Sequence, residues 1–183
     1  MALSWDFPYP SRRMPVLARN VVATSQPLAA QAGLRMLLKG GNAADAALAA
    51  AITLTVVEPT SNGIGSDAFA IVWDGEKLLG LNSSGRSPRA WTRQRFAGIE
   101  GMPTYGWDTV TVPGAVAAWV ALSKRVGKLP FADLFEPAIA YAEHGYPVSP
   151  ITARRWQDAQ ARYPNFAEIN RTFFPGGRAP NPG

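Results

Sequence analysis

A turn rich in serine and glycine carries the residues with the clearest chemical potential. Arg86 lies in residues 82–88, directly after a strand-like run. A guanidinium fixed in a turn can hold a carboxylate through two parallel hydrogen bonds, and a neighbouring hydroxyl can donate another. We therefore predict that Arg86 binds a carboxylate, with Ser84 or Ser87 as the second donor.

The same region is unusually basic. Arg86, Arg89, Arg93 and Arg95 lie close together with no acidic residue among them, in a chain of 183 residues with a formal charge of +5. A solvated basic loop is the simplest interpretation of such a cluster, and nucleic-acid or other anion binding is the alternative. No basic recognition helix or aromatic-studded basic strand accompanies the arginines, so we expect no nucleic-acid partner.

Several kinds of catalytic and metal site are excluded by composition. The chain has no cysteine and one histidine, His144. The absence of cysteine rules out disulfides, thiolate metal sites and a cysteine nucleophile. A single histidine argues against an intrachain Ser-His-Asp triad and against a multi-histidine metal site. His144 stands in the last turn of a helical pattern before Gly145, where a cation complements the helix dipole, so we predict a capping role. We expect no catalytic residue, cofactor or metal site in this chain.

A glycine motif at residues 63–68 has the G-x-G-x-x-A spacing of dinucleotide-binding turns. That motif needs a strand before it and a helix after it, so that a pyrophosphate meets the helix N-terminus. Here a predicted helix precedes it and a predicted hairpin follows. We therefore expect a sharp turn that passes close to a neighbouring segment or ligand.

Two consecutive helices are predicted near the N-terminus. Ser25 is expected to cap the first, with Pro27 in its first turn, and the glycines after Lys39 end it. Asn42 is expected to cap the second, over residues 43–57, which is apolar on nearly every face and therefore buried between layers. Its β-branched end could instead form a strand, but the alanine-rich start favours the helix.

A hairpin and further helices follow. Strand-like runs at residues 69–73 and 76–81 flank Asp74-Gly75, a pair that predicts a type I′ turn. A loop continues to about residue 110. Three helices are predicted over residues 114–126, 137–144 and 150–162, and Asn165 is expected to cap one more short helix.

The two ends of the chain are expected to differ from its middle. Residues 1–20 hold no signal-peptide core and form an expected N-terminal arm, and no segment is apolar enough to span a membrane, so we expect a cytoplasmic protein. The last nine residues, PGGRAPNPG, are typical of a linker. A lone hairpin is also too little sheet for a core layer, so we expect further strands C-terminal to this sequence.

Several sequence blocks together resemble the γ-glutamyltransferase family of N-terminal nucleophile hydrolases. They are VVATSQPLAAQAGLRMLLKGGNAADAALAAAITLTVVEP, SNGIGSDAFAIVW, the NSSGRSP turn, TVPGAVAAW and LPFADLFEPAIAYAEHGYPVS. The GGNAADAA block, the Val-Pro-Gly step and the PAI-YAE-GY block are specific when they occur together. Their order and spacing agree with the family across almost the whole chain.

The resemblance implies an α+β fragment, dominated by helices, of an αββα four-layer sandwich. It implies a precursor that cleaves itself, exposing a threonine nucleophile that lies outside this chain. Residues 21–183 would then be an incomplete domain, the N-terminal portion of the large subunit. The implied partners are a γ-glutamyl or related acyl or amide substrate and the missing C-terminal part or small subunit.

Two departures from the family pattern bear on the substrate. The family holds the glutamyl carboxylate with an arginine in an Asp-aromatic-Arg-Glu-x-Ala-Pro turn, and alignment on Pro88 places that position at Ser84, two residues before Arg86. Ser66-Asp67-Ala68 also replaces glycines. Both departures resemble the acylase or amidohydrolase branches, which leaves glutathione open as a substrate. The alternatives are a non-catalytic interaction module and an anion- or nucleic-acid-binding domain.

Overall fold

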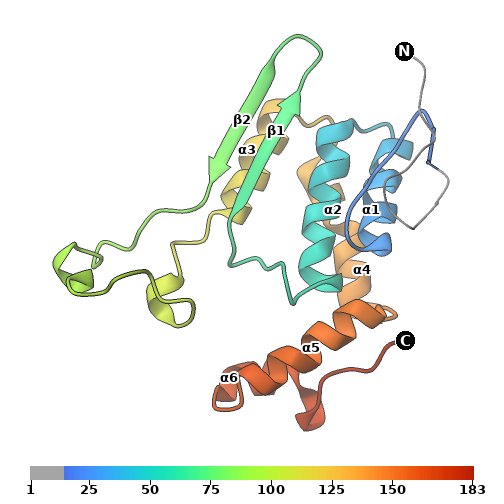
Figure 1. The fold of residues 1–183 in the computed structure, drawn as a ribbon. Coiled ribbons are helices and arrows are strands. Elements are labelled where there is room, and N and C mark those ends of the chain that lie inside the picture. The colour runs from blue at the N-terminus through green and yellow to red at the C-terminus, as the bar shows by residue number, and fades with distance from the viewer. Residues whose placement is uncertain (1–14) are drawn as a thin grey trace.

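The computed structural model describes residues 15–183 and places helix α2 (Ala43–Val57) at the centre of the fold. Around it lie α1 (Pro27–Leu38), α3 (Ala115–Val126) and α4 (Glu136–His144) (Figure 1). A two-stranded antiparallel sheet, β1 (Ala68–Trp73) and β2 (Leu78–Ser83), lies against α3. Helices α5 (Pro150–Arg162) and α6 (Ala167–Phe173) follow α4 and lie across one end of the bundle.

Four short 3-10 helices complete the described elements. Two lie in the long segment between β2 and α3, one precedes α4 and one follows α6: Gln94–Phe96, Trp107–Thr109, Phe131–Phe135 and Pro175–Gly177. Residues 1–14 of the expected N-terminal arm lie outside the described residues. None of the helices in residues 15–183 has the length and apolar character needed to cross a bilayer.

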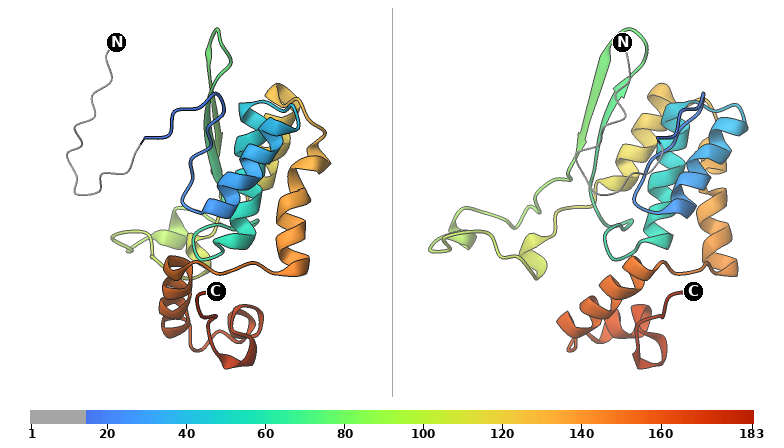
Figure 2. Two further views of the ribbon diagram at one scale, coloured as in Figure 1. Left: turned by 90° about the vertical axis from the view of Figure 1, so that its right-hand side faces the viewer. Right: turned by 45° about the vertical axis from the view of Figure 1, so that its right-hand side comes forward.

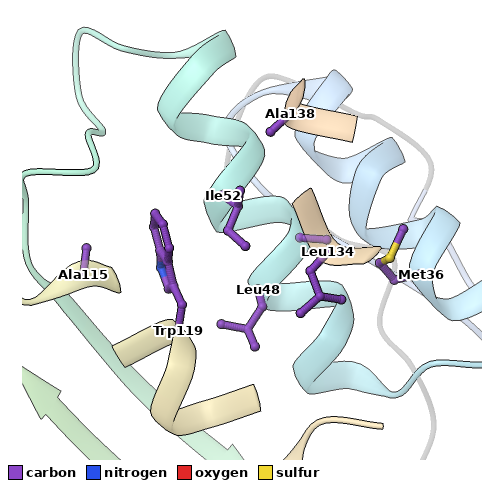
Figure 3. Packing of buried hydrophobic residues seen from close by; sticks show 8 residues of the cluster. Met36, Leu48, Ile52, Ala115, Trp119, Leu134 and Ala138 are labelled. Atoms are coloured by element: carbon purple, nitrogen blue, oxygen red, sulfur yellow. The ribbon is translucent and has the colours of Figure 1, made fainter. Parts of the chain in front are cut away.

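The hydrophobic core is built on α2. Leu48 and Ile52 pack there with Met36 of α1, Trp119 of α3 and Leu134 of the 3-10 helix before α4 (Figure 3). Each of these side chains is buried. Neighbours on three sides thus explain why α2 has no polar face. The helix continues to Val57, which confirms the predicted helix and rejects the strand alternative for its second half.

Asn42 caps the start of α2, as the sequence predicts, and it does so within a reciprocal capping box. The Asn42 side chain accepts from the Asp45 backbone N–H at 3.1 Å, and the Asp45 carboxylate accepts from the Asn42 N–H at 2.9 Å. The same fully buried carboxylate also accepts from the backbone N–H groups of Lys128 and Leu129, at 3.1 and 3.3 Å. Asp45 therefore joins the start of α2 to the connection that follows α3.

Helix α1 begins differently from the prediction. Its N-cap is Gln26, whose side chain accepts from the Leu28 N–H, whereas the Ser25 hydroxyl donates to the carboxylate of Glu58 at the end of α2. The Ser25 hydroxyl bonds to Glu58 because this buried carboxylate needs hydrogen-bond donors. The guanidinium of Arg155 on α5 supplies a second donor at 3.2 Å. The predicted Ser25 cap is therefore wrong, although the helix starts at Pro27 as expected.

The hairpin has two different faces. Ala70 pairs with Leu81 and Val72 with Leu79, and these partly buried side chains face α3. On the opposite face, the exposed pairs include Ile71 with Gly80 and Trp73 with Leu78. Figure 2 shows the hairpin extending beyond the helices, with this outer face uncovered by the described residues. One side of the sheet thus packs on helix and the other is apolar and open.

The turn of the hairpin differs from the predicted type I′ geometry. Four residues, Asp74 to Lys77, connect the strands, and Gly75 alone among them has a positive φ, of 105°. The Asp74 carboxylate accepts from the backbone N–H groups of Glu76 and Lys77, each at 2.9 Å. This side-chain bonding favours a longer turn in which Asp74 keeps a negative φ, so a two-residue turn is not formed.

The C-terminal region confirms one predicted helix and corrects two expectations. Helix α5 spans Pro150–Arg162 as predicted, and Ser149 caps it by accepting from the Thr152 N–H at 3.2 Å. Helix α6 starts after Phe166 without a side-chain cap, so the expected Asn165 cap is wrong. The linker-like tail instead packs back onto α5: Ala179 is buried, and its N–H donates to the Gln160 side chain at 2.9 Å.

Candidate functional site

The turn that carries Arg86 begins where β2 ends, at the open end of the hairpin. It is fixed against the segment that enters α3. The Val112 N–H donates to the Arg86 carbonyl at 2.9 Å, and the Thr111 hydroxyl donates to the Ser84 carbonyl at 2.9 Å. The Ser83 hydroxyl donates to the Gly114 carbonyl at 2.8 Å. These bonds determine the backbone path of the turn without using the Arg86 side chain.

Two glycines allow this close approach. A Cβ on Gly85, which has a φ of +83°, would lie 1.9 Å from the Val112 carbonyl oxygen. A Cβ on Gly114 would lie 2.1 Å from the Ser83 carbonyl oxygen. Both distances are far inside van der Waals contact, so neither position accepts a side chain without moving the backbone.

The glycine motif at residues 63–68 reaches the same anchor. The Ser66 carbonyl accepts from the N–H groups of Gly114 and Ala115, at 3.1 and 3.0 Å. The motif is a turn between α2 and β1, and no helix follows it, which confirms the expected sharp turn close to a neighbouring segment. The N–H groups of Gly114 and Ala115 at the start of α3 are taken by the Ser66 carbonyl, and a strand follows the motif, so the dinucleotide-binding arrangement is not formed.

The three predicted binding residues lie on one turn with different surroundings. Ser84 is partly buried, and its hydroxyl contacts the neighbouring Gly85 carbonyl at 3.4 Å. Arg86 and Ser87 are exposed. Within residues 15–183, the Arg86 guanidinium forms no ion pair, so its donors remain open to a ligand. The turn can therefore present one charged fork and two hydroxyls to an anion.

The basic cluster is not a continuous cationic surface. Arg95 is neutralised by Asp108, with its Nε and Nη2 donating to one carboxylate oxygen at 3.1 and 2.6 Å. Trp91 and Phe96 pack edge to face at 5.6 Å between ring centroids and anchor the same loop. Arg95 therefore has a structural partner that lies outside the run of arginines in the sequence.

His144 occupies the predicted capping position. Its Nδ1 lies 3.2 Å from the carbonyl oxygen of Ala140, one turn back in α4, and Gly145 follows with a φ of 80°. Within residues 15–183, no three His, Cys, Asp or Glu side chains gather closely enough to hold a metal ion.

Asp67 is a charged residue at this end of the hairpin that the sequence marked as a replaced glycine and not as a binding residue. It directly precedes β1, whose first residue Ala68 pairs with Ser83. The same register sets Asp67 opposite Ser84. Counting back from a two-residue Asp74-Gly75 turn would have set it opposite Asn82, so its place follows from the four-residue turn of the structure.

A cavity between α2, α4 and the C-terminal segments lies away from the Arg86 turn. It has a volume of about 590 Å³, and aromatic side chains including Tyr141, Tyr146, Trp156 and Phe173 line it. Partial burial raises the pKa of Tyr146 above its usual value, so the phenol stays protonated at neutral pH. Arg86 and the serines of its turn do not line this cavity.

The chain matches known proteins over nearly its full length. Residues 29–183 match the sequence model of the family described as Gamma-glutamyltranspeptidase. The Glutathione hydrolase-like YwrD proenzyme of Bacillus subtilis (strain 168) is 40% identical over 171 residues, which cover 90% of this chain and 32% of that protein. The Acylase ACY 1 proenzyme of Pseudomonas sp. (strain SE83) is 33% identical over 182 residues, covering 91% of this chain and 32% of that protein.

Solved structures agree with the fold. A cephalosporin acylase from Bacillus halodurans superposes with a TM-score of 0.87 at 52% identity, covering 100% of this chain and 36% of the acylase chain. The Helicobacter pylori gamma-glutamyltranspeptidase gives a TM-score of 0.84 at 29% identity, covering 93% of this chain and 51% of that chain.

The chain thus spans about a third of the length of the curated relatives named above. The structural matches and the helix-rich fold with one small sheet confirm the expected class, an α+β fragment of an N-terminal nucleophile hydrolase. On the matched residues and the structural agreement, the chain belongs to the gamma-glutamyltranspeptidase family.

Proposed function

We propose that residues 21–183 form the N-terminal portion of the large subunit of a self-cleaving amide hydrolase or acyl transferase. The names of the matched relatives support this assignment, since they are described as proenzymes of glutathione hydrolase-like and acylase proteins. The threonine nucleophile and its oxyanion donors would come from outside this chain. Because amide hydrolysis needs both groups in one site, this chain alone is expected to be inactive.

The observation that carries the binding role is the rigid Arg86 turn. Its backbone is held through the Arg86 and Ser84 carbonyls, while the guanidinium is exposed and unpaired within residues 15–183. A turn whose backbone is already fixed loses little backbone freedom when it binds, and the planar guanidinium fork matches the two oxygens of a carboxylate. Arg86 would hold the carboxylate of the acyl donor, with Ser84 or Ser87 as the second hydrogen-bond donor.

The exposed apolar face of the hairpin indicates a second partner besides the substrate, a further part of the protein. Phe69, Ile71, Trp73 and Leu78 are each more than 60% exposed there. An apolar sheet face of this kind is normally covered by another layer. We propose that strands from the part of the relatives that this chain does not span cover this face and bring the nucleophile towards the Arg86 turn.

Substitution of Arg86 in the full-length protein tests the carboxylate role. With an amide donor that bears a free carboxylate, Arg86→Ala is expected to raise KM strongly, because the lost charged hydrogen bonds are worth about 2–5 kcal/mol when buried under substrate. Arg86→Lys should recover little of this loss, since an ammonium cannot reproduce the two-pronged contact.

Arg89→Ala is the matched control, because Arg89 is an exposed arginine three residues away and without an ion pair in the described part of the chain. It removes the same charge without touching the fixed turn. An unchanged KM in Arg86→Ala, or equal changes in the two variants, would place the carboxylate anchor elsewhere.

A further inference from the structure

Helix α5 lies across the end of the bundle at which α2 ends (Figure 1), and the proposed function gives it no role. Arg155 on this helix pairs through its Nη1 with the buried carboxylate of Glu58, the residue that follows α2, at 3.2 Å. The same Nη1 donates to the Ser61 hydroxyl at 3.2 Å. The Glu58 carbonyl in turn accepts from the Ser61 N–H, also at 3.2 Å. Arg155 therefore closes a ring of bonds around the start of the connection from α2 to β1.

This connection ends at the support of the Arg86 turn. Its Ser66 carbonyl accepts from the N–H groups of Gly114 and Ala115, at 3.1 and 3.0 Å. Two residues before Gly114, the Val112 N–H donates to the Arg86 carbonyl at 2.9 Å. The connection thus runs from its bonds with α5 to the segment that fixes Arg86.

The far end of α5 contacts a second connection, residues 84–114 between β2 and α3. The Arg162 guanidinium lies over the Tyr105 ring, 5.7 Å from its centroid, and the Tyr163 ring packs edge to face on Tyr105 at 6.3 Å. Arg86 lies at the beginning of this connection. Helix α5 therefore holds the second connection as well, by aromatic contacts.

The two contacts of α5 share one face of the helix. Arg155 and Arg162 are seven residues apart, which places them two turns apart on the same side and about 10.5 Å apart along the axis. Both connections that meet at the Arg86 turn are therefore held by one rigid element, at a spacing that the helix sets.

We propose that Arg155 is a positioning residue of the carboxylate site, which acts through Glu58 and the connection after α2 on the place of the Arg86 turn. The inference rests on the proposed function, since Arg155 reaches a carboxylate only through Arg86. A shift of this connection moves the bonds between Ser66 and the start of α3, and the turn moves with them. Loss of Arg155 should thus weaken binding of donors that bear a carboxylate and leave neutral donors unaffected.

The test compares two donors that differ in the carboxylate. In the full-length protein, Arg155→Ala is expected to raise KM for glutaryl-p-nitroanilide about three- to tenfold, the size of coupling through a packed network. KM for pentanoyl-p-nitroanilide, which lacks the carboxylate, should stay at the wild-type value. A residue that only stabilises the fold would instead lower the apparent kcat for both donors and leave both KM values unchanged. Arg155→Lys should keep most of the wild-type KM, because an ammonium can also donate to Glu58 and Ser61.

The double variant Arg86→Ala/Arg155→Ala shows whether Arg155 acts through Arg86. Once Arg86 is removed, the second substitution should raise KM for the glutaryl donor no further, because residues coupled in one network are not additive. Fully additive effects, or equal changes in KM for the two donors in Arg155→Ala, would overturn the inference.

Arg154→Ala is the matched control, because Arg154 is the adjacent exposed arginine of α5 and has no ion pair within residues 15–183. Tyr105→Ala loosens the second contact of α5 and leaves the pair of Arg155 and Glu58 intact, so it decides the case if Arg155→Ala does not fold. It should raise KM for the glutaryl donor and not for the pentanoyl donor.

The Arg86→Ala variant separates this inference from the proposed function. An unchanged KM for the glutaryl donor in Arg86→Ala overturns the carboxylate anchor and this inference with it. A KM that rises in Arg86→Ala but stays unchanged in Arg155→Ala overturns this inference alone.

Discussion

Among single residues, Asp45 makes the connections that matter most for the fold. Its fully buried carboxylate accepts from three backbone N–H groups, of Asn42, Lys128 and Leu129. Gly41 and Gly127 lie so close that a Cβ on either would come within 3.0 Å of a carboxylate oxygen. Gly41 before Asn42 and Gly127 after α3 thus both lie directly against this one side chain.

Replacing Asp45 should therefore be costly. Asp45→Ala leaves three backbone donors without an acceptor, and it is expected to lower the free energy of unfolding by about 3 kcal/mol or more. Urea denaturation followed by circular dichroism measures this loss. Asp158→Ala, at an exposed aspartate on α5, should change stability by less than about 0.5 kcal/mol. Similar losses in the two variants would contradict the role assigned to Asp45.

The sequence predicts half of what Asp45 does. The capping box is local, because Asn42 and Asp45 are three residues apart, and its pattern is visible in the sequence. The bonds to Lys128 and Leu129 span more than 80 residues and depend on how α3 ends beside α2. The turn that carries Arg86 is similar: its residue types predict Arg86 as a carboxylate ligand, whereas the place of Asp67 follows from strand register.

Among the structural elements, the connection from β2 to α3 depends on Gly85. Gly85→Ala forces a side chain into a positive φ and against the Val112 carbonyl. The backbone conformation alone should cost about 1–3 kcal/mol. Because the turn must move, KM for a carboxylate-bearing donor should rise as in Arg86→Ala. Gly65→Ala, where a Cβ would meet nothing within 4 Å, is the control for both measurements.

The hairpin turn should make stability depend on pH through Asp74. Backbone N–H groups of Lys77 and Glu76 hold the pKa of the Asp74 carboxyl below its usual value. A lowered folded-state pKa gives stability that is present above the unfolded pKa of about 3.9 and is lost as pH falls through the folded value. Wild type should therefore exceed Asp74→Ala in its urea midpoint at pH 7, and the difference should shrink as the pH falls below the unfolded pKa.

Glu76→Ala serves as the comparison for this pH dependence. Its backbone N–H still donates to Asp74, and the removed side chain is exposed. The difference in urea midpoint between wild type and Glu76→Ala should not shrink in the same way as the pH falls. A difference between wild type and Asp74→Ala that stays constant with pH would show that the carboxylate charge contributes nothing.

The helices are predicted well because their signals are local. Proline at the start of α1, alanine-rich sequence in α2 and glycine after α3 and α4 each act within one turn. The errors arise where a distant group competes for the same side chain. Ser25 leaves its expected cap for Glu58, which is 33 residues away. The C-terminal tail has the composition of a linker, but the hydrogen bond from the Ala179 N–H to the Gln160 side chain holds it against α5.

For the whole molecule, the open apolar face of the hairpin dominates the behaviour of the isolated chain. Ile71 is 78% exposed in the middle of that face. Unpaired strand edges and an uncovered apolar face favour association, so the 183-residue chain is expected to form dimers or larger species at high concentration.

Ile71→Lys should shift this equilibrium towards monomer in sedimentation velocity experiments. Its control is Ile151→Lys on α5, which replaces an apolar residue of comparable exposure, 68%, away from the sheet. A wild-type chain that stays monomeric at high concentration, or equal effects of both lysines, would show that this face does not drive association.

The bonds from Asp45 to residues 128 and 129 also bear on the order in which the molecule assembles. Helices α1 and α2 are joined by four residues and pack directly on each other, so their contacts close early and at low entropic cost. The second set of Asp45 bonds closes a loop that contains the whole hairpin and α3. We expect the amides of α2 to gain protection in pulse-labelling hydrogen exchange before those of Lys128 and Leu129. The Asp45 carboxylate would then cap α2 early in folding and join α2 to the end of α3 only when the bundle is complete.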